Sequence, residues 1–455
     1  MKIKHCCLVF LLIALTGFEG CKIGPNYKRP AVDTGKEYRF SRPADSLSFG
    51  DSSWTYIFRD PVLQQLIWQG LGNNFDLLMA FEKVNQARAA FKSSRADIWP
   101  SLGISGDAAY QSQPSPAGGT VEYHDFYGTA NLSWEIDIWG KLRRAKEAAR
   151  AQLLSQEAYR QSVRISLIAG IASAYFSLVE LQDEYQITRF NVSIREEALA
   201  LVRAKLIAGT VSGLVVAQAE AELASLKAMI PSLENSIGSE EAALRLLTGN
   251  LPGPVTLGDS IIRQINPAVI PSAGIPSSLI THRPDILGAE QVLIAANAQI
   301  GVARGAMLPA ISINANIGYS YLGAGVIGAA VGSLVAPVFN FGKLRANLRK
   351  SQSVYAEMLI SYQKTIYTAI GEVSSGILAV EKQAQVISDN QNLVRAAQTA
   401  FDLSNQLFNA GYASYLDVIN AQRSLYEAQI QLSYSRMLEL QAITNLYLAL
   451  GGGWK

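Results

Sequence analysis

The feature that most constrains the fold is an internal repeat, because one long pattern of residues occurs twice along the chain. Three short markers return 202 positions later, as Gly140-Lys141-Leu142 and Gly342-Lys343-Leu344, Ala208-Gly209 and Ala410-Gly411, and Thr248-Gly249 and Leu450-Gly451. Solenoid repeats have periods of about 20–50 residues, so this repeat is too long to be one of them. The sequence therefore predicts two copies of one structural half.

Each half is dominated by helix. A segment without proline runs from Lys141 to about Ile207, and its counterpart runs from Lys343 to about Asn409. At a rise of 1.5 Å per residue, each would form a helix on the order of 100 Å long, well beyond a globular helix. An Ala-Gly break and a helix of roughly 40 residues follow each segment. Leucine and alanine alternate at heptad positions around the second break, which predicts a mainly α fold with coiled-coil-like helices.

Each half also contains a pair of segments in which apolar and polar residues alternate. The predicted strands are Ser101–Gln111, Tyr127–Ile138, Ile311–Tyr321 and, least clearly, Ser333–Phe341. Their length is close to the roughly 9–11 residues that a tilted strand needs to cross a bilayer. A soluble sandwich explains the alternation of any one strand equally well. Four strands cannot close a barrel, and an open edge leaves backbone groups unpaired in lipid, so a membrane version must be shared among several chains.

The N-terminus predicts export. Lys2 and Lys4 precede an apolar run from Cys6 to Leu15, and Gly20-Cys21 follows a short polar segment. This pattern is a secretory signal, and it is too short for a transmembrane helix. After removal of residues 1–20, Cys21 is the only cysteine. Its position resembles the lipobox of bacterial lipoproteins, which predicts a covalent lipid on Cys21; the alternative is an unpaired cysteine near an ordinary cleavage site.

The overall charge gives no reason to expect a nucleic-acid partner. The chain has 39 basic and 37 acidic residues, for a net charge of +2. Only 17% of its residues are charged, below the roughly 25% of typical soluble domains. This composition suits closely packed helices or a surface that faces a membrane.

Three sequence features suggest a dinucleotide site, a transmembrane helix and a glycosidase site, and we reject these interpretations. Residues Gly323 to Gly328 spell the GxGxxG of a dinucleotide site, but the next acidic residue is Glu357, so we interpret them as a flexible loop between strands. The stretch from Leu322 to Val338 is too short and too rich in glycine for a transmembrane helix. Glu135 and Asp137 have the spacing of an inverting glycosidase pair, but carboxylates lining a lumen explain them better. The three histidines, His5, His124 and His282, are scattered, so we expect neither an enzyme nor a metal site.

Three segments carry a resemblance to a known family. They are Cys21-Lys-Ile-Gly-Pro-Asn-Tyr-Lys-Arg-Pro30, the Arg283-Pro-Asp-Ile286 motif with Ala289-Glu290 and the run from Ala295 to Arg304, and Phe408-Asn-Ala-Gly411 through Tyr415-Leu-Asp-Val418 to Asn420-Ala-Gln422. Together they resemble the TolC-like outer-membrane efflux proteins, in the lipoprotein branch that serves resistance-nodulation-division (RND) pumps. The likeness covers nearly the whole exported chain.

The resemblance implies a homotrimer in the outer membrane that is lipid-anchored, extends into the periplasm and has no bound cofactor. Each chain would give four strands to a shared 12-stranded transmembrane β-barrel and long helices to a trimeric α-barrel. An inner-membrane RND transporter would supply the energy, and a periplasmic adapter protein would dock on the hairpin tips. The implied docking residues are Gly209, Thr210, Ser212, Gly411, Tyr412 and Ser414.

The resemblance also implies a gate at the periplasmic tip. Asp417 matches a position of the acidic ring that constricts the family's tunnel, and three symmetric carboxylates would favour cations. The alternative is a solvated aspartate on a helix surface. The chain has Asn420 where a second acid often occurs and Ala413 where an arginine can hold the tip closed. We therefore expect a weaker ring at Asp417 and Asn420, and a different closing contact.

The predicted organisation follows from the repeat and the resemblance. It comprises the signal peptide (1–20), a lipidated N-terminal segment with the first helices (21–99), the first β-hairpin (100–139), the first long helix pair (140–249), an equatorial linker and helix (250–308), the second β-hairpin (309–341), and the second long helix pair with the C-terminal equatorial segment (342–455).

The predicted function is a passive exit duct for drugs, metals or other small molecules handed on by an inner-membrane pump. A duct for type I protein secretion has the same architecture and is the nearest alternative. A structural envelope lipoprotein without a pore is the alternative from another class.

Overall fold

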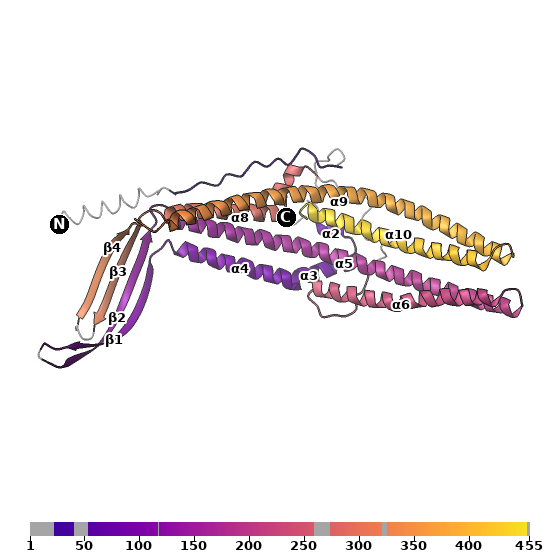
Figure 1. Cartoon of the computed structure of the whole chain (residues 1–455), viewed down its shortest axis with the longest axis horizontal. Helices are drawn as coiled ribbons and strands as arrows, with labels where there is room; N and C mark the ends of the chain where they lie inside the picture. Colours follow the sequence, from indigo (N-terminus) through magenta and orange to yellow (C-terminus); the bar gives the residue numbers. More distant parts are fainter. Residues whose placement is uncertain (1–21, 41–52, 117, 259–273, 321–324, 453–455) are drawn as a thin grey trace. The chain divides into compact units, whose positions relative to one another are not determined.

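The structure is a computed structural model that describes residues 22–40, 53–116, 118–258, 274–320 and 325–452 (Figure 1). The predicted signal peptide and Cys21 lie outside the described residues. The chain forms two compact units, each assembled from three separate stretches. Unit 1 contains Met1–Val32, Glu82–Ala158 and Leu287–Lys364, and unit 2 contains Asp33–Phe81, Tyr159–Ile286 and Thr365–Lys455.

The four longest helices confirm the predicted repeat. Helix α5 (Lys141–Ile207) and helix α9 (Lys343–Asn409) have 67 residues each. Helix α6 (Gly213–Leu247) and helix α10 (Tyr415–Ala449) have 35 each, slightly fewer than predicted. Both pairs begin and end 202 positions apart. The long helices end where predicted because a glycine with positive φ follows each of them, Gly209 at +72° and Gly411 at +82°.

Shorter helices precede each hairpin. In the first half they are α2 (Trp54–Ile57), α3 (Pro61–Asn73) and α4 (Phe75–Ala96); in the second they are η3 (Pro276–Ser278), α7 (Leu279–His282) and α8 (Pro284–Gly305). The side chain of Asp60 caps α3 by accepting the Val62 N–H at 2.8 Å, with proline at the first helical position. Helices α4 and α8 have 22 residues each and end just before a strand, so the repeat extends to them.

The strands form one antiparallel sheet in the order β1-β2-β3-β4. Its members are β1 (Ser101–Pro114), β2 (Thr120–Ile136), β3 (Ala310–Ser320) and β4 (Gly325–Val335), shown in unit 1 in Figure 1. Because every strand reverses the previous one, the four junctions between strand and helix lie at the same end of the sheet. The predicted first and third strands are confirmed, and β2 begins seven residues earlier than predicted.

The fourth strand was placed wrongly by the sequence analysis. It runs over Gly325–Val335 and not over Ser333–Phe341, and Ala310 pairs with Val335 at its end. The cause is composition: glycine and alanine at alternate positions hide the period-two pattern, whereas the residues beyond Val335 are bulkier. Pro337 lacks the N–H that a ladder position needs. The interpretation of the GxGxxG segment as a loop is also wrong for Gly325 to Gly328, which belong to β4.

Unit 2 contains a core of large apolar side chains from several helices. Phe58, Tyr175, Phe176 and Tyr447 are fully or almost fully buried, and their rings contact one another at tilted or edge-on angles. The hydroxyl of Tyr175 donates to the Asp60 carboxylate at 2.6 Å, so the one polar atom of that ring has a partner. This core fixes the middle of α5 against α2, α3 and the end of α10.

An acidic group on α5 is also buried in unit 2. Glu180 is 5% exposed. Burial, followed by repulsion from Glu184 and Asp183, raises the pKa of Glu180 from its usual 4.5 to about 7. The folded protein therefore holds a proton on Glu180 at pH values where the unfolded chain has lost it. This contribution to stability is complete below pH 4.5 and disappears as the pH rises through 7.

We expect Glu180→Gln to raise the stability of the folded chain in alkaline solution by about 1–3 kcal/mol and to change it little near pH 5. The glutamine removes a carboxylate that is charged and buried above neutral pH. The free energy of unfolding, followed by circular dichroism in detergent at both pH values, measures the effect. Glu197→Gln, an exposed position on the same helix, is the matched control. An equal gain at both pH values would contradict the assignment.

Candidate functional site

Over β1 to β3, the sheet of unit 1 separates apolar from polar residues into two chemically different faces; on β4, Val331 and Val335 fall on the polar face. Residues directly opposite in the ladder share a face. One face carries the pairs Leu102↔Leu132, Ile104↔Ala130, Trp134↔Ile313, Ala130↔Ile317 and Ile311↔Leu334. The opposite face carries Ser105↔Thr129, Asn131↔Asn316, Ser133↔Asn314, Glu135↔Ser312 and Ser312↔Ser333.

The described residues leave most of the apolar face uncovered, although Trp134 is part-buried and its ring N–H donates to the Ile98 carbonyl at 3.0 Å. Ile104 is 87% exposed, Leu102 is 73% exposed and Val326 is 72% exposed. On the polar face, by contrast, side chains bond to one another: Ser105 and Thr129 hydroxyls lie 2.8 Å apart, and Asn131 donates to Thr129 at 3.0 Å. An uncovered apolar face opposite a hydrated one is the pattern of a barrel wall between lipid and water.

Both edges of this sheet are open within the chain. Strand β1 pairs only with β2, and strand β4 pairs only with β3, among the residues described. Hydrocarbon offers no hydrogen-bond partner to the outer backbone N–H and C=O groups of these edges. Each unpaired group therefore costs several kcal/mol in lipid. In lipid, this geometry would require another chain at each edge, which stays a prediction from the sequence.

The two hairpin tips of unit 2 end their first helix in the same way. At the first tip, the N–H of Gly209 donates to Leu206 and that of Thr210 donates to Lys205, both at 2.9 Å. At the second, Gly411 and Tyr412 donate to Phe408 and Leu407. These are Schellman motifs, in which the glycine must adopt the left-handed conformation. No atom lies within 4 Å of a Cβ built on either glycine, so conformation alone selects the residue.

The two tips differ in how their second helix begins. Ser414 and Asp417 form a capping box: Asp417 N–H donates to the Ser414 hydroxyl at 3.3 Å, and Ser414 N–H donates to the Asp417 carboxylate at 2.9 Å. Ser212, the counterpart of Ser414, makes no side-chain cap bond, and Val215, which stands where Asp417 stands in the second half, has no carboxylate for the return bond. Asp417 therefore has a structural role at the helix start besides the predicted one at the gate.

The predicted gate residues lie on the exposed side of α10. Asp417 and Asn420 are three residues apart and both exposed, whereas Val418 and Ile419 are buried. The hydrogen bonds from Ser414 hold the pKa of Asp417 below its usual value. Asp417 therefore keeps its negative charge in mildly acidic solution.

Beneath the tips, an apolar cluster joins α5, α6 and α10, and Phe401 and Phe408 of α9 pack against it. It contains Leu199, Val202, Ala219, Leu223, Tyr415, Val418 and Ile419. A charged group lies beside it: the Glu222 carboxylate on α6 pairs with Arg195 on α5 at 2.8 Å and also with Arg423 on α10. Burial lowers the pKa of Arg195, and Glu222 opposes that effect. No sequence pattern indicated this three-helix contact, because its members are far apart in the chain.

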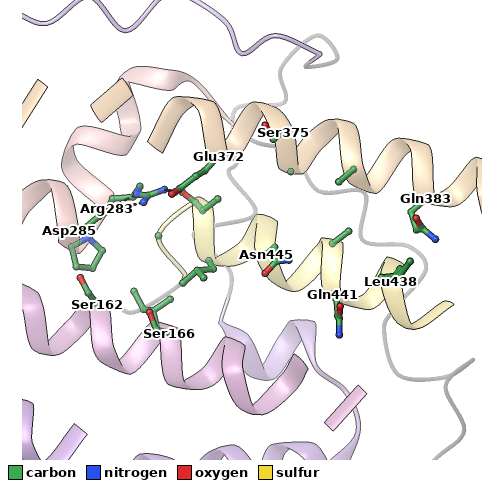
Figure 2. A pocket seen from close by; sticks show the side chains of 18 of the residues that line it. Ser162, Ser166, Arg283, Asp285, Glu372, Ser375, Gln383, Leu438, Gln441 and Asn445 are labelled. Carbon is green, nitrogen blue, oxygen red and sulfur yellow. Dashed lines mark hydrogen bonds and ion pairs between the residues drawn. The ribbon is translucent and has the colours of Figure 1, made fainter. Parts of the chain in front are cut away.

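The Arg283-Pro-Asp motif forms a clamp beside a cavity of about 820 Å³ in unit 2 (Figure 2). The Arg283 guanidinium donates to Asp285 at 2.7 and 3.0 Å, to Glu372 on α9 at 2.8 Å and to the Ala449 carbonyl on α10 at 2.7 Å. Ser162, Ser166, Gln441 and Asn445 also line the cavity. Since Arg283 already makes four hydrogen bonds within the protein, it serves to join the helices.

The segment after Cys21 is bound along unit 1. The buried guanidinium of Arg144 donates to the carbonyls of Ile23 and Gly24, both at 3.1 Å. Farther along, Glu290 on α8 accepts two bonds of 2.7 Å from Arg29 and one of 3.0 Å from Tyr27. Burial and the Glu290 charge raise the pKa of Tyr27. The sequence pattern around Glu290 predicts no role for it, because its partners Tyr27 and Arg29 are more than 260 residues away in the chain.

The features that suggested an enzyme have structural partners. Glu135 pairs with Lys141 at 2.6 Å, and Asp137 accepts the backbone N–H groups of Leu142 and Arg143 at the start of α5. The two carboxylates are thus engaged at a helix start. Within the described residues, no group of three or more His, Cys, Asp or Glu side chains could hold a metal ion.

Comparisons with known proteins agree with this geometry. The family model described as outer membrane efflux protein matches residues 66–250 and 275–452. The toluene efflux pump outer membrane protein TtgC of Pseudomonas putida is 32% identical over 470 residues, covering 98% of this chain and 95% of TtgC. The probable outer membrane lipoprotein SilC of Salmonella typhimurium is 30% identical over 450 residues, covering 96% of each.

A solved structure has the same fold over almost the whole chain. The open state of the Neisseria gonorrhoeae MtrE outer membrane channel superposes with a TM-score of 0.86 at 28% identity, covering 96% of this chain and 99% of MtrE. The matched regions of the family model include all four long helices and both β-hairpins. This chain belongs to the outer membrane efflux protein family.

Proposed function

We propose that this chain is the outer-membrane exit duct of a tripartite efflux pump. The observation that carries the proposal is the sheet of unit 1, with one apolar face uncovered, one polar face and two open edges. Lipid covers the first face, water fills the space beside the second, and neighbouring copies pair with the edges. The duct is passive, and an inner-membrane RND transporter supplies the energy.

Three copies make the pore. Four strands from each give a 12-stranded barrel, which is wider than the roughly eight-stranded barrels that side chains fill. The four long helices of each chain continue as a shared tunnel in the periplasm. The predicted segments 21–99, 100–139, 140–249, 250–308, 309–341 and 342–455 give the equatorial, membrane and tunnel parts. Cys21 carries the lipid that holds the assembly in the outer membrane, and the name of SilC as a lipoprotein supports this.

The hairpin tips dock the periplasmic adapter. Large apolar side chains are exposed beside both glycines: Ile207 is 90% exposed and Tyr412 is 85% exposed, and Leu214 and Leu416 are also exposed. Such a patch on a secreted chain is typical of a protein interface. The docking set is Gly209, Thr210, Ser212, Gly411, Tyr412 and Ser414.

The gate lies beside this surface. Three copies of Asp417, with Asn420 one helical turn away, form a ring of single negative charges that favours cations. The pKa of Asp417 lies below its usual value, so the ring stays charged in mild acid.

We expect the purified full-length chain to give a cross-linked mass of three copies and single-channel conductance in planar bilayers. Ile104→Lys, on the uncovered apolar face, should reduce the inserted fraction strongly, since a lysine at that depth costs about 2–4 kcal/mol. Ser105→Lys, its neighbour on the polar face, should insert normally and alter only the conductance. A soluble monomer without conductance, or equal effects of the two lysines, would refute the duct.

Asp417→Asn should lower the permeability ratio of cations to anions by roughly two- to fivefold, because the ring loses its charge. Adding Asn420→Asp to this variant should restore the preference one turn away. Reversal potentials in a potassium chloride gradient measure both. Asp402→Asn, at an exposed position on α9, controls for charge in general. Unchanged selectivity in Asp417→Asn would remove Asp417 from the gate.

Gly209→Ala and Gly411→Ala should each strain their tip by roughly 1 kcal/mol, because alanine resists the left-handed conformation. We expect lower cross-linking to the adapter in cells and lower drug or metal resistance. Gly213→Ala is the matched control at the same tip: its φ is not positive and its added Cβ meets no atom within 4 Å. If all three alanines behave alike, the tip conformation does not serve docking.

A further inference from the structure

The start of α9 carries an unusual concentration of positive charge. Lys343, Arg345, Arg349 and Lys350 lie within its first eight residues and are all exposed. None of them makes an ion pair or a side-chain hydrogen bond with any residue that the structure describes. No aspartate or glutamate occurs in the sequence between Glu290 and Glu357. Arg345 and Arg349, four residues apart, share one side of the helix, and Lys343 and Lys350, seven residues apart, share another. We call these four residues, which surround the first two turns, the α9 basic patch.

This arrangement opposes the helix dipole. The N-terminus of a helix carries a partial positive charge, so cations there destabilise the helix, and acidic residues are the favoured ones. The first turn of α9 contains no acid. Folding alone thus gives no reason for four cations at this position, whereas a bound anion would be attracted both by them and by the helix end.

The repeat provides an internal comparison, because α5 begins with a basic run of its own. There three of the four cations in the first eight residues are paired with acids: Glu135 pairs with Lys141, Asp137 pairs with Arg143 at 3.2 Å, and Glu147 pairs with Arg144 at 3.0 Å, which leaves Lys146. The residues 202 positions later are Pro337, Phe339 and Arg349. The second half has therefore lost all three acids, and one of them is replaced by a further cation.

The surroundings of the patch point to a membrane surface. Phe339 and Phe341 precede it and are 77% and 90% exposed, and the centroids of their rings lie 4.6 Å apart. Trp99, also exposed, lies just before β1 at the same end of the sheet. Membrane proteins typically place aromatic residues at the edge of the hydrocarbon layer and cations at the level of the headgroups, and the residues here follow the same order.

A neighbouring copy would not neutralise the patch. Strand β4 and the following patch lie at one open edge of the sheet, and β1 lies at the other. Pairing of these edges would bring the end of a second copy's α4 alongside. That segment carries Lys92 and Arg95 but only one acid, Asp97, so it adds net positive charge.

We propose that the α9 basic patch binds the headgroups of anionic phospholipids in the periplasmic leaflet of the outer membrane. The ligand class is a phosphodiester lipid such as phosphatidylglycerol or cardiolipin. Each trimer has three such sites, one under each β4 strand. The patch fixes the depth of the barrel, whereas the matching end of α5, where three of the four cations pair with acids, does not take part.

The test uses the full-length trimer in vesicles of phosphatidylethanolamine with or without phosphatidylglycerol. After detergent extraction, native mass spectrometry counts the phosphatidylglycerol molecules retained at increasing lipid concentration. The variant is Arg345→Gln/Arg349→Gln/Lys350→Gln. The control, Lys364→Gln/Lys382→Gln/Arg395→Gln, removes three charges from the same helix farther along the chain.

We expect the apparent affinity of phosphatidylglycerol to fall roughly fivefold for each cation removed, and by about 100-fold for the triple variant at low salt. Arg345→Lys/Arg349→Lys should retain most of it, and salt should weaken binding in the wild type. The control variant should bind as the wild type does.

Three results would overturn the proposal. The first is equal lipid retention by the wild type and the triple variant. The second is an altered anion permeability without altered retention, which would place the cations in the lumen. The third is competition by inorganic phosphate as effective as that by the lipid. Conductance in neutral lipid is recorded in parallel, so that failure of this site is separated from failure of the duct.

Discussion

Unpaired backbone groups at the edges of a four-stranded sheet are the constraint on which the rest of the assembly depends. In water such edges are solvated, but in hydrocarbon nothing replaces the missing partners. The uncovered side chains of Ile104 and Val326 require hydrocarbon on one face, so lipid and neighbouring copies are needed together. A single copy can fold its helices around the core at Tyr175, but its strands reach their lowest free energy only within a ring.

The internal repeat gives both halves of the chain the same helical framework. The sequences of the two halves differ where their roles differ. The long helices keep equal lengths, 67 and 35 residues, and each tip keeps its glycine in a left-handed turn. Differences are concentrated at helix starts. Asp417 completes a capping box that Val215 cannot form. At the start of α5, Asp137 and Glu147 pair with cations, whereas the cations at the start of α9 have no acidic partner. Equivalent positions thus share a backbone and differ in charge.

The elements that follow from local rules could be predicted, and those that depend on distant contacts could not. The bounds of α5 and α9 follow from the absence of proline and from Gly209 and Gly411. The sheet's first three strands follow from a two-residue period. Strand β4 was misplaced because its glycine and alanine residues carry little hydrophobic signal. The Arg144 and Glu290 contacts to the N-terminal segment, and the Arg195–Glu222–Arg423 group, join residues with no periodic relation. The trimer and its partners came from family resemblance, since edge pairing alone gives no copy number.

The exposed apolar side chains divide into two groups, one suited to contact with lipid and one suited to contact with another protein. In the proposed duct, those on the sheet, such as Ile104, would face hydrocarbon, and the exposed Phe339 and Phe341 would lie where hydrocarbon meets headgroups. Ile207 and Tyr412 stand at helical hairpins, where water surrounds a lone chain and only another protein can cover them. Charges follow the same division: uncompensated cations lie next to the membrane strands, and a capped aspartate lies at the tips.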